Sequence, residues 1–220
     1  MISWLDLVVK EVAEVAPRST RRTVGLGETG EKDADPDSDG AIVIEIVTYN
    51  PAWPRLYAQE LERLRSALGH IAARIEHNGS TSIPGLAAKP VIDIQVSVLA
   101  LAPIEPYRLP LEQLGYTHVP HADDAFCPFF HRPSGWPHTH HLHVVVAGGD
   151  EESRTLAFRD YLRDHRDALD EYASLKRILA MRFSDEDPAS QERYACAKSA
   201  FIEDIIARAR AEGYRHTAPS

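Results

Sequence analysis

The sequence predicts an α/β fold, a mixed sheet with flanking helices followed by a C-terminal helical part. Apolar residues recur at period two in short segments before Gly148, and at helical spacing in the segments after it. The chain has 220 residues, 44% of them hydrophobic, which is enough for one domain with a substantial core. We expect this domain at residues 41–212, with the sheet core at 41–149 and the helical part at 150–212.

The strand predictions rest on β-branched runs and on alternation. In residues 91–98, Asp93 and Gln95 alternate with apolar side chains, so that one face of the strand is polar. His141 and His143 share a face of a later strand in the same way. The other strands are expected at residues 41–47, 71–77, 116–119 and 141–147.

Helices are predicted where apolar side chains form a stripe. Tyr57, Leu61, Leu64 and Leu68 recur at i, i+4, i+7 and i+11, which indicates a helix over residues 55–68 that packs on a sheet. Further helices are expected at residues 109–114, 153–163, 167–181 and 188–211.

Both ends of the chain are expected to lie outside the domain. Residues 17–40 are rich in glycine, proline and aspartate, so we predict a mobile extension over residues 1–40 and a disordered tail over 213–220. Residues 25–30 match G-x-G-x-x-G, but they lack the preceding strand and following helix of a dinucleotide site. We therefore assign that motif to the linker.

The charge balance argues against two classes of partner. The formal net charge is −9, and no apolar run reaches the roughly 18 residues of a membrane span. The N-terminus carries acids where a signal peptide has a basic start. Neither nucleic acid nor a membrane is an expected partner, and we expect a cytoplasmic protein; the composition leaves its oligomeric state open.

The most informative stretch is HNGSTSIPGLAAKPVIDIQV at residues 77–96. A predicted strand ends there in a Gly-Ser-Thr-Ser turn, which offers hydroxyl groups and backbone N–H groups without bulky side chains. A lysine-bearing loop follows, and the next strand presents an acid. The candidate phosphate-binding residues are Gly79, Ser80, Thr81, Ser82 and Lys89.

This stretch resembles the GrpB family, which is placed in the nucleotidyltransferase superfamily. The resemblance covers about residues 42–209 and continues in segments 141–144, 158–163, 172–176 and 194–202. It implies a nucleotidyltransferase-like cleft between the sheet and the helices, with Asp93 as a catalytic metal ligand. It also implies that one wall of the cleft is closed by Arg159, Tyr161, Lys176, Tyr194 and Lys198.

In that superfamily two acids on one strand hold divalent metal ions, and here the second acid is replaced by Gln95. His141 and His143 are expected on the same side of the sheet and can supply further ligands. The expected cofactor is therefore a divalent metal, Mg²⁺, Mn²⁺ or Zn²⁺, held by Asp93, Gln95, His141 and His143.

Two functions follow from the resemblance. One is metal-dependent nucleotidyl transfer to a small molecule, with a phosphorylated small molecule or nucleotide as ligand. The alternative is a non-catalytic nucleotide- or phosphate-binding or regulatory module of the same fold. A third role, assistance to a partner enzyme, is suggested by the occurrence of GrpB modules as C-terminal appendages of dephospho-CoA kinase.

Overall fold

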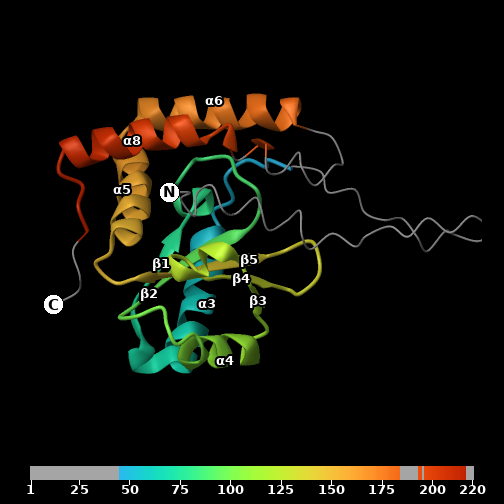
Figure 1. The fold of residues 1–220 in the computed structure, drawn as a ribbon. Coiled ribbons are helices and arrows are strands. Elements are labelled where there is room, and N and C mark those ends of the chain that lie inside the picture. The colour runs from blue at the N-terminus through green and yellow to red at the C-terminus, as the bar shows by residue number, and fades with distance from the viewer. Residues whose placement is uncertain (1–44, 184–192, 195, 217–220) are drawn as a thin grey trace, which may run out of the picture.

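The structure is a computed structural model that describes residues 45–183, 193–194 and 196–216 (Figure 1). The predicted extension over residues 1–40, most of the strand expected at 41–47 and the start of the helix expected at 188 lie outside these residues. In chain order the elements are α3 (Trp53–Leu68), η1 (Gly69–Ile71), β1 (Ala72–Asn78), η2 (Ser80–Ser82), β2 (Ile92–Val98), α4 (Glu105–Gln113), β3 (Thr117–Val119), η3 (Ala122–Ala125), β4 (Phe129–Arg132), β5 (His140–Val146), α5 (Asp150–Asp164), α6 (Arg166–Arg182) and α8 (Ser199–Ala211).

In the described part of the chain, β1 to β5 form one mixed sheet in the order β1-β2-β5-β4-β3. Only β2 and β5 pair in parallel; the other neighbours are antiparallel. The predicted α/β class is thus confirmed. The pairing register places Asn78, Asp93, His141 and His131 in one row across four strands. The next row contains Glu76, Gln95, His143 and Phe129.

One face of the sheet forms the main apolar core with α3 and α4, which lie below the sheet in Figure 1. Leu64 and Leu68 of α3 are buried there, as the helical stripe predicts. The apolar side chains that alternate with the polar ones on β2 and β5 pack on the same face and are buried. These are Ile92, Ile94, Leu142 and Val144.

The opposite, polar face of the sheet is covered in part by α5. Thr155 of α5 donates to Gln95, and Ser97 donates to Glu152 of the same helix. Because α5 supplies these partners, most of the polar face of β2 is buried. Its alternating sequence is typical of a strand with one face in solvent. Above the sheet, α6 and α8 lie side by side and share a second apolar core with α5 (Figure 1).

Three details differ from the sequence-based expectations. Val47 makes a single antiparallel bridge with Ala88 where a full strand was expected. β4 was missed, because its short aromatic run lies between prolines. In the segment predicted as a disordered tail, Tyr214 donates to Asp164 and His216 pairs with Asp160.

Every helix in the described ranges falls short of the length or apolarity that a membrane-spanning segment requires.

Candidate functional site

A cleft of about 90 Å³ lies between the sheet and the helical layer. The sheet contributes the start of β2 and β5, and α6 and the segment before α8 form the opposite wall. The lining residues are Ile46, Ser80, Lys89, Val91, Asp93, Trp136, His141, Lys176, Tyr194 and Lys198.

Gly79 brings the turn after β1 against Asp93. Its φ is +63° and its ψ is −172°, a conformation open essentially only to glycine. A Cβ at this position would overlap the Asp93 carboxylate. The glycine of the sequence motif therefore serves the close approach of turn and acid.

Gly79→Ala should destabilise the protein and displace Asp93. Positive φ alone costs an alanine roughly 1–2 kcal/mol, and the overlap with the carboxylate adds to that. Gly85→Ala is the matched control, because Gly85 also has positive φ (+82°) but its nearest contact would be an ordinary 3.5 Å. Thermal unfolding of both variants should show the larger loss for Gly79→Ala; equal losses would contradict a specific role for the overlap with Asp93.

Of the three hydroxyl groups in the turn, two form hydrogen bonds within the protein and one lies at the cleft. Thr81 donates to the Val91 carbonyl and Ser82 donates to the Gly79 carbonyl, and both side chains are buried. Both hydroxyl groups thus hold the turn, and neither residue is among those that line the cleft. Ser80 lines the cleft, where it contacts the Tyr172 hydroxyl.

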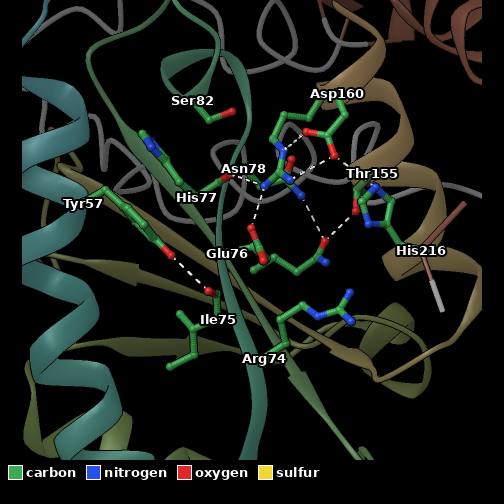
Figure 2. A network of polar contacts seen from close by, with 12 residues as sticks. Tyr57, Arg74, Ile75, Glu76, His77, Asn78, Ser82, Thr155, Asp160 and His216 are labelled. Carbon is green, nitrogen blue, oxygen red and sulfur yellow. Dashed lines mark hydrogen bonds and ion pairs between the residues drawn. The ribbon is translucent and has the colours of Figure 1, made fainter. Parts of the chain in front are cut away.

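Two arginines of α5 fix the turn from behind. Arg159 donates to the His77 carbonyl (2.9 Å) and to Glu76 (2.8 Å), and Arg163 donates to the Ser82 carbonyl (2.9 Å). Figure 2 shows the Glu76 and Asp160 carboxylates turned toward this junction, whereas the His77 ring points away from it. Arg159 thus holds the turn and is not among the residues that line the cleft. The resemblance implies a place for it in the cleft wall, which other residues form.

Asp160 ties the two arginines together. It accepts from Arg163 at 3.1 Å. It also accepts from Arg159 at 2.7 Å, and His216 lies 3.0 Å away (Figure 2). Burial raises the pKa of this carboxyl, but the hydrogen bond and charge of Arg159 outweigh burial, so that the pKa is lowered overall. The carboxylate is therefore held in the ionised form that the arginines require.

Imidazole groups continue from Asp93 along the sheet. His141 Nδ1 lies 3.5 Å from Asp93 Oδ1, and His141 Nε2 lies 3.2 Å from His138 Nδ1. The His138 ring stacks on His131 with 3.9 Å between centroids. Burial, with the charges of His131 and His141, lowers the pKa of His138 to about 3, so this imidazole is neutral.

Three lysines converge on the cleft from distant parts of the chain. The ammonium groups of Lys89 and Lys198 lie 5.3 and 4.6 Å from the centre of the Tyr194 ring. Lys176 donates to the Ala87 carbonyl at 2.5 Å and lies 4.8 Å from the ring of Tyr172. Among the described lining residues, the opposing carboxylate is Asp93, so cationic groups predominate.

Burial makes two of these lysines easy to deprotonate. Desolvation and the charge of Lys198 lower the pKa of Lys89 to about 7, although Asp93 opposes the shift. The same causes, in the same order, lower the pKa of Lys176 well below its usual value. An anionic ligand would stabilise the charged ammonium form of both groups.

Two of the four predicted metal ligands lie away from the cleft. Gln95 is fully buried, and its Oε1 already accepts from Asn78 (3.0 Å) and Thr155 (2.5 Å). His143 is buried 4.9 Å from the ring of Phe129, centroid to centroid. Of the four, Asp93 and His141 line the cleft, whereas Thr155 of α5 covers Gln95 and Phe129 packs on His143.

The groups at the cleft do not fit a protein-held pair of divalent metal ions. In the ranges that the structure describes, no three His, Cys, Asp or Glu side chains are arranged to hold one ion. Mg²⁺ and Mn²⁺ favour oxygen ligands, and Zn²⁺ takes nitrogen, sulfur or oxygen, whereas this cleft places three lysine side chains beside one carboxylate and one imidazole. The arrangement suits an anion.

The sequence alone left two parts of the site undetermined. Trp136 lines the cleft from the loop before β5, where no sequence signal set it apart from its neighbours. Lys176, Tyr194 and Lys198 do form a wall, as the resemblance implies. Tyr161 instead packs in the helical core against His165.

The sheet, the glycine-serine turn and the acid on the next strand define a mixed α/β protein with a lysine-lined cleft under a helical layer, consistent with the nucleotidyltransferase-like arrangement expected from the sequence. The family model described as GrpB protein matches residues 43–208. The chain belongs to the GrpB family.

Similar proteins agree with this assignment. UPF0157 protein BH1888 of Halalkalibacterium halodurans is 41% identical over 169 residues, covering 76% of this chain and 83% of that protein. The crystal structure of conserved protein GrpB from Enterococcus faecalis matches with a TM-score of 0.68 and 30% identity, over 78% of this chain and all of that one. A dephospho-CoA kinase of Mycolicibacterium paratuberculosis is 30% identical over 76% of this chain, which spans only 46% of the kinase.

Proposed function

We propose that this GrpB protein binds a phosphorylated small molecule or nucleotide, with the phosphate in the cleft between the sheet and the helical layer. The convergence of Lys89, Lys176 and Lys198 carries the proposal. Phosphate is bound by fixed cations and hydroxyl donors, and Ser80 adds a hydroxyl group at the same place.

Nucleotidyl transfer is a second candidate function, favoured by Asp93 at the mouth of the cleft beside His141. The Asp93 carboxylate is placed to accept the proton of an attacking hydroxyl group, with the imidazole of His141 beside it to orient the carboxylate. The three lysines would neutralise the charge that collects on a departing pyrophosphate. This chemistry would use the same anion site as simple binding.

Lys198→Met should weaken the binding of inorganic pyrophosphate by about tenfold or more, since a charge-assisted hydrogen bond contributes roughly 1.5–3 kcal/mol. Isothermal titration calorimetry measures the loss. Arg65→Met is the matched control, because it removes the same charge from an exposed position on α3, paired with Glu62.

Unchanged pyrophosphate affinity in Lys198→Met, or an equal loss in Arg65→Met, would overturn the anion site. Incubating the parent protein with ATP separates the two functions. Release of pyrophosphate indicates transfer, and binding of ATP without turnover indicates a binding module.

A further inference from the structure

A second hollow adjoins the phosphate cleft and has no assigned role. Its volume is about 350 Å³, within the roughly 300–1,000 Å³ of typical small-molecule sites. Lys89, Val91 and Trp136 line both spaces, so a ligand can extend from one into the other. The remaining lining residues are Glu45, Pro90, Pro137 and His138.

The two spaces differ in size and in chemistry. The cleft, at about 90 Å³, is small and lined by cations. The adjoining hollow is about four times larger, and prolines, valine and an indole ring make up much of its wall. The cleft suits an anionic group, and the hollow suits the less polar body of the same ligand.

Trp136 is the principal aromatic surface of the hollow. Its side chain is 40% exposed, although it packs edge-on against His138 with 5.2 Å between ring centroids. A large aromatic group left this accessible beside a cationic cleft can stack on a flat ring.

His138 adds a polar group that the described residues do not satisfy. The residue is only 6% exposed, and its Nε2 has no hydrogen-bond partner in the described part of the chain. If His141 directs its single N–H at the Asp93 carboxylate, His141 Nε2 must accept from His138 Nδ1. His138 Nε2 then carries a lone pair with no hydrogen-bond donor opposite it among the described residues. A buried acceptor left unsatisfied costs free energy, which a ligand that donates a hydrogen bond to it would recover.

We infer that the hollow binds a flat nitrogen heterocycle with an N–H donor, an inference that rests on the proposed phosphate site. The ligand of this cleft is then a nucleotide. Trp136 stacks on the ring and His138 accepts from its edge. Lys89, at the boundary of the two spaces, holds the phosphate end.

The experiment compares adenosine monophosphate with ribose 5-phosphate, which share sugar and phosphate and differ in the base. The parent protein should bind adenosine monophosphate about tenfold more tightly, because stacking of a base on an aromatic side chain is of that size. Trp136→Leu should remove this preference, measured as the ratio of the two affinities within the same variant. Trp136→Phe should keep most of it, and Phe126→Leu, at an exposed ring that lines neither space, should keep all of it.

Equal affinities of the parent for the two ligands would overturn the inference, as would a preference that persists in Trp136→Leu. Either result leaves the phosphate site intact, provided that pyrophosphate binding still depends on Lys198. Loss of all pyrophosphate binding in the parent would instead overturn the proposed function.

Discussion

Gln95→Glu should destabilise the protein by several kcal/mol at neutral pH, and the loss should grow as pH rises. Gln95 is fully buried, with its oxygen held by Asn78 and Thr155. Burial raises the pKa of a carboxyl group, by about 3 units or more at such a site. The substituted carboxyl keeps both hydrogen bonds while it is protonated, so at acid pH the variant should approach the parent.

The pH range of this loss follows from linkage. Glutamate has a pKa of about 4.3 in the unfolded chain and a higher one in the folded protein. Above about pH 4.3 the variant should therefore lose roughly 1.4 kcal/mol of unfolding free energy per pH unit, until the folded-state pKa is passed. Urea unfolding at several pH values measures the difference from the parent.

Gln95→Met is the control, because it is neutral and similar in volume and its loss should not depend on pH. A Gln95→Glu protein as stable as the parent at neutral pH would contradict the burial argument. The sequence motif would then again indicate a metal site with two carboxylates on β2. In that case, added Mn²⁺ should stabilise the variant.

Anion binding in the cleft should weaken by roughly tenfold or more as pH rises from about 7 to about 9. The pKa of Lys89 is about 7 in the free protein, and a bound anion raises it, so binding is accompanied by proton uptake. Through Lys89, affinity is then constant below about pH 7 and falls up to tenfold per pH unit above it. Lys198, Asp93 and Arg177 are the charged groups that act on the two buried lysines.

Sulfate is the suitable probe, because its charge stays fixed over this pH range. Lys89→Arg is the matched variant, since a guanidinium remains charged throughout. It should bind sulfate with a pH dependence smaller by about one proton. A parent whose sulfate affinity is constant up to about pH 9, or rises, would contradict titration of buried lysines in the site.

The alternation along β2 and β5 correctly predicts which side chains share a face, because that follows from strand geometry alone. It does not predict how deeply each of these side chains is buried. The parallel register pairs Asp93 with His141 at the open end of the sheet and Gln95 with His143 one row further in. Tertiary contacts bury the second pair: Thr155 of α5 packs on Gln95, and Phe129 of β4 packs on His143.

The candidate phosphate residues show a similar limit. The composition of the turn predicts a tight, hydroxyl-rich bend, and the structure has one at η2. Which hydroxyl faces outward depends on contacts with the Val91 and Gly79 carbonyls, and these leave Ser80 alone of the three at the cleft. Lys176 and Lys198 reach it from the helical layer, a placement that no local pattern encodes.

The arginine contacts from α5 determine how the cleft meets a ligand. Because Arg159 and Arg163 already hold the carbonyls at both ends of the turn, its backbone entropy is lost when the chain folds. A ligand therefore finds a preorganised surface, and little of its binding energy is consumed in ordering the protein. Differences in affinity between ligands should then appear mainly in how slowly each one leaves, while their rates of entry stay similar.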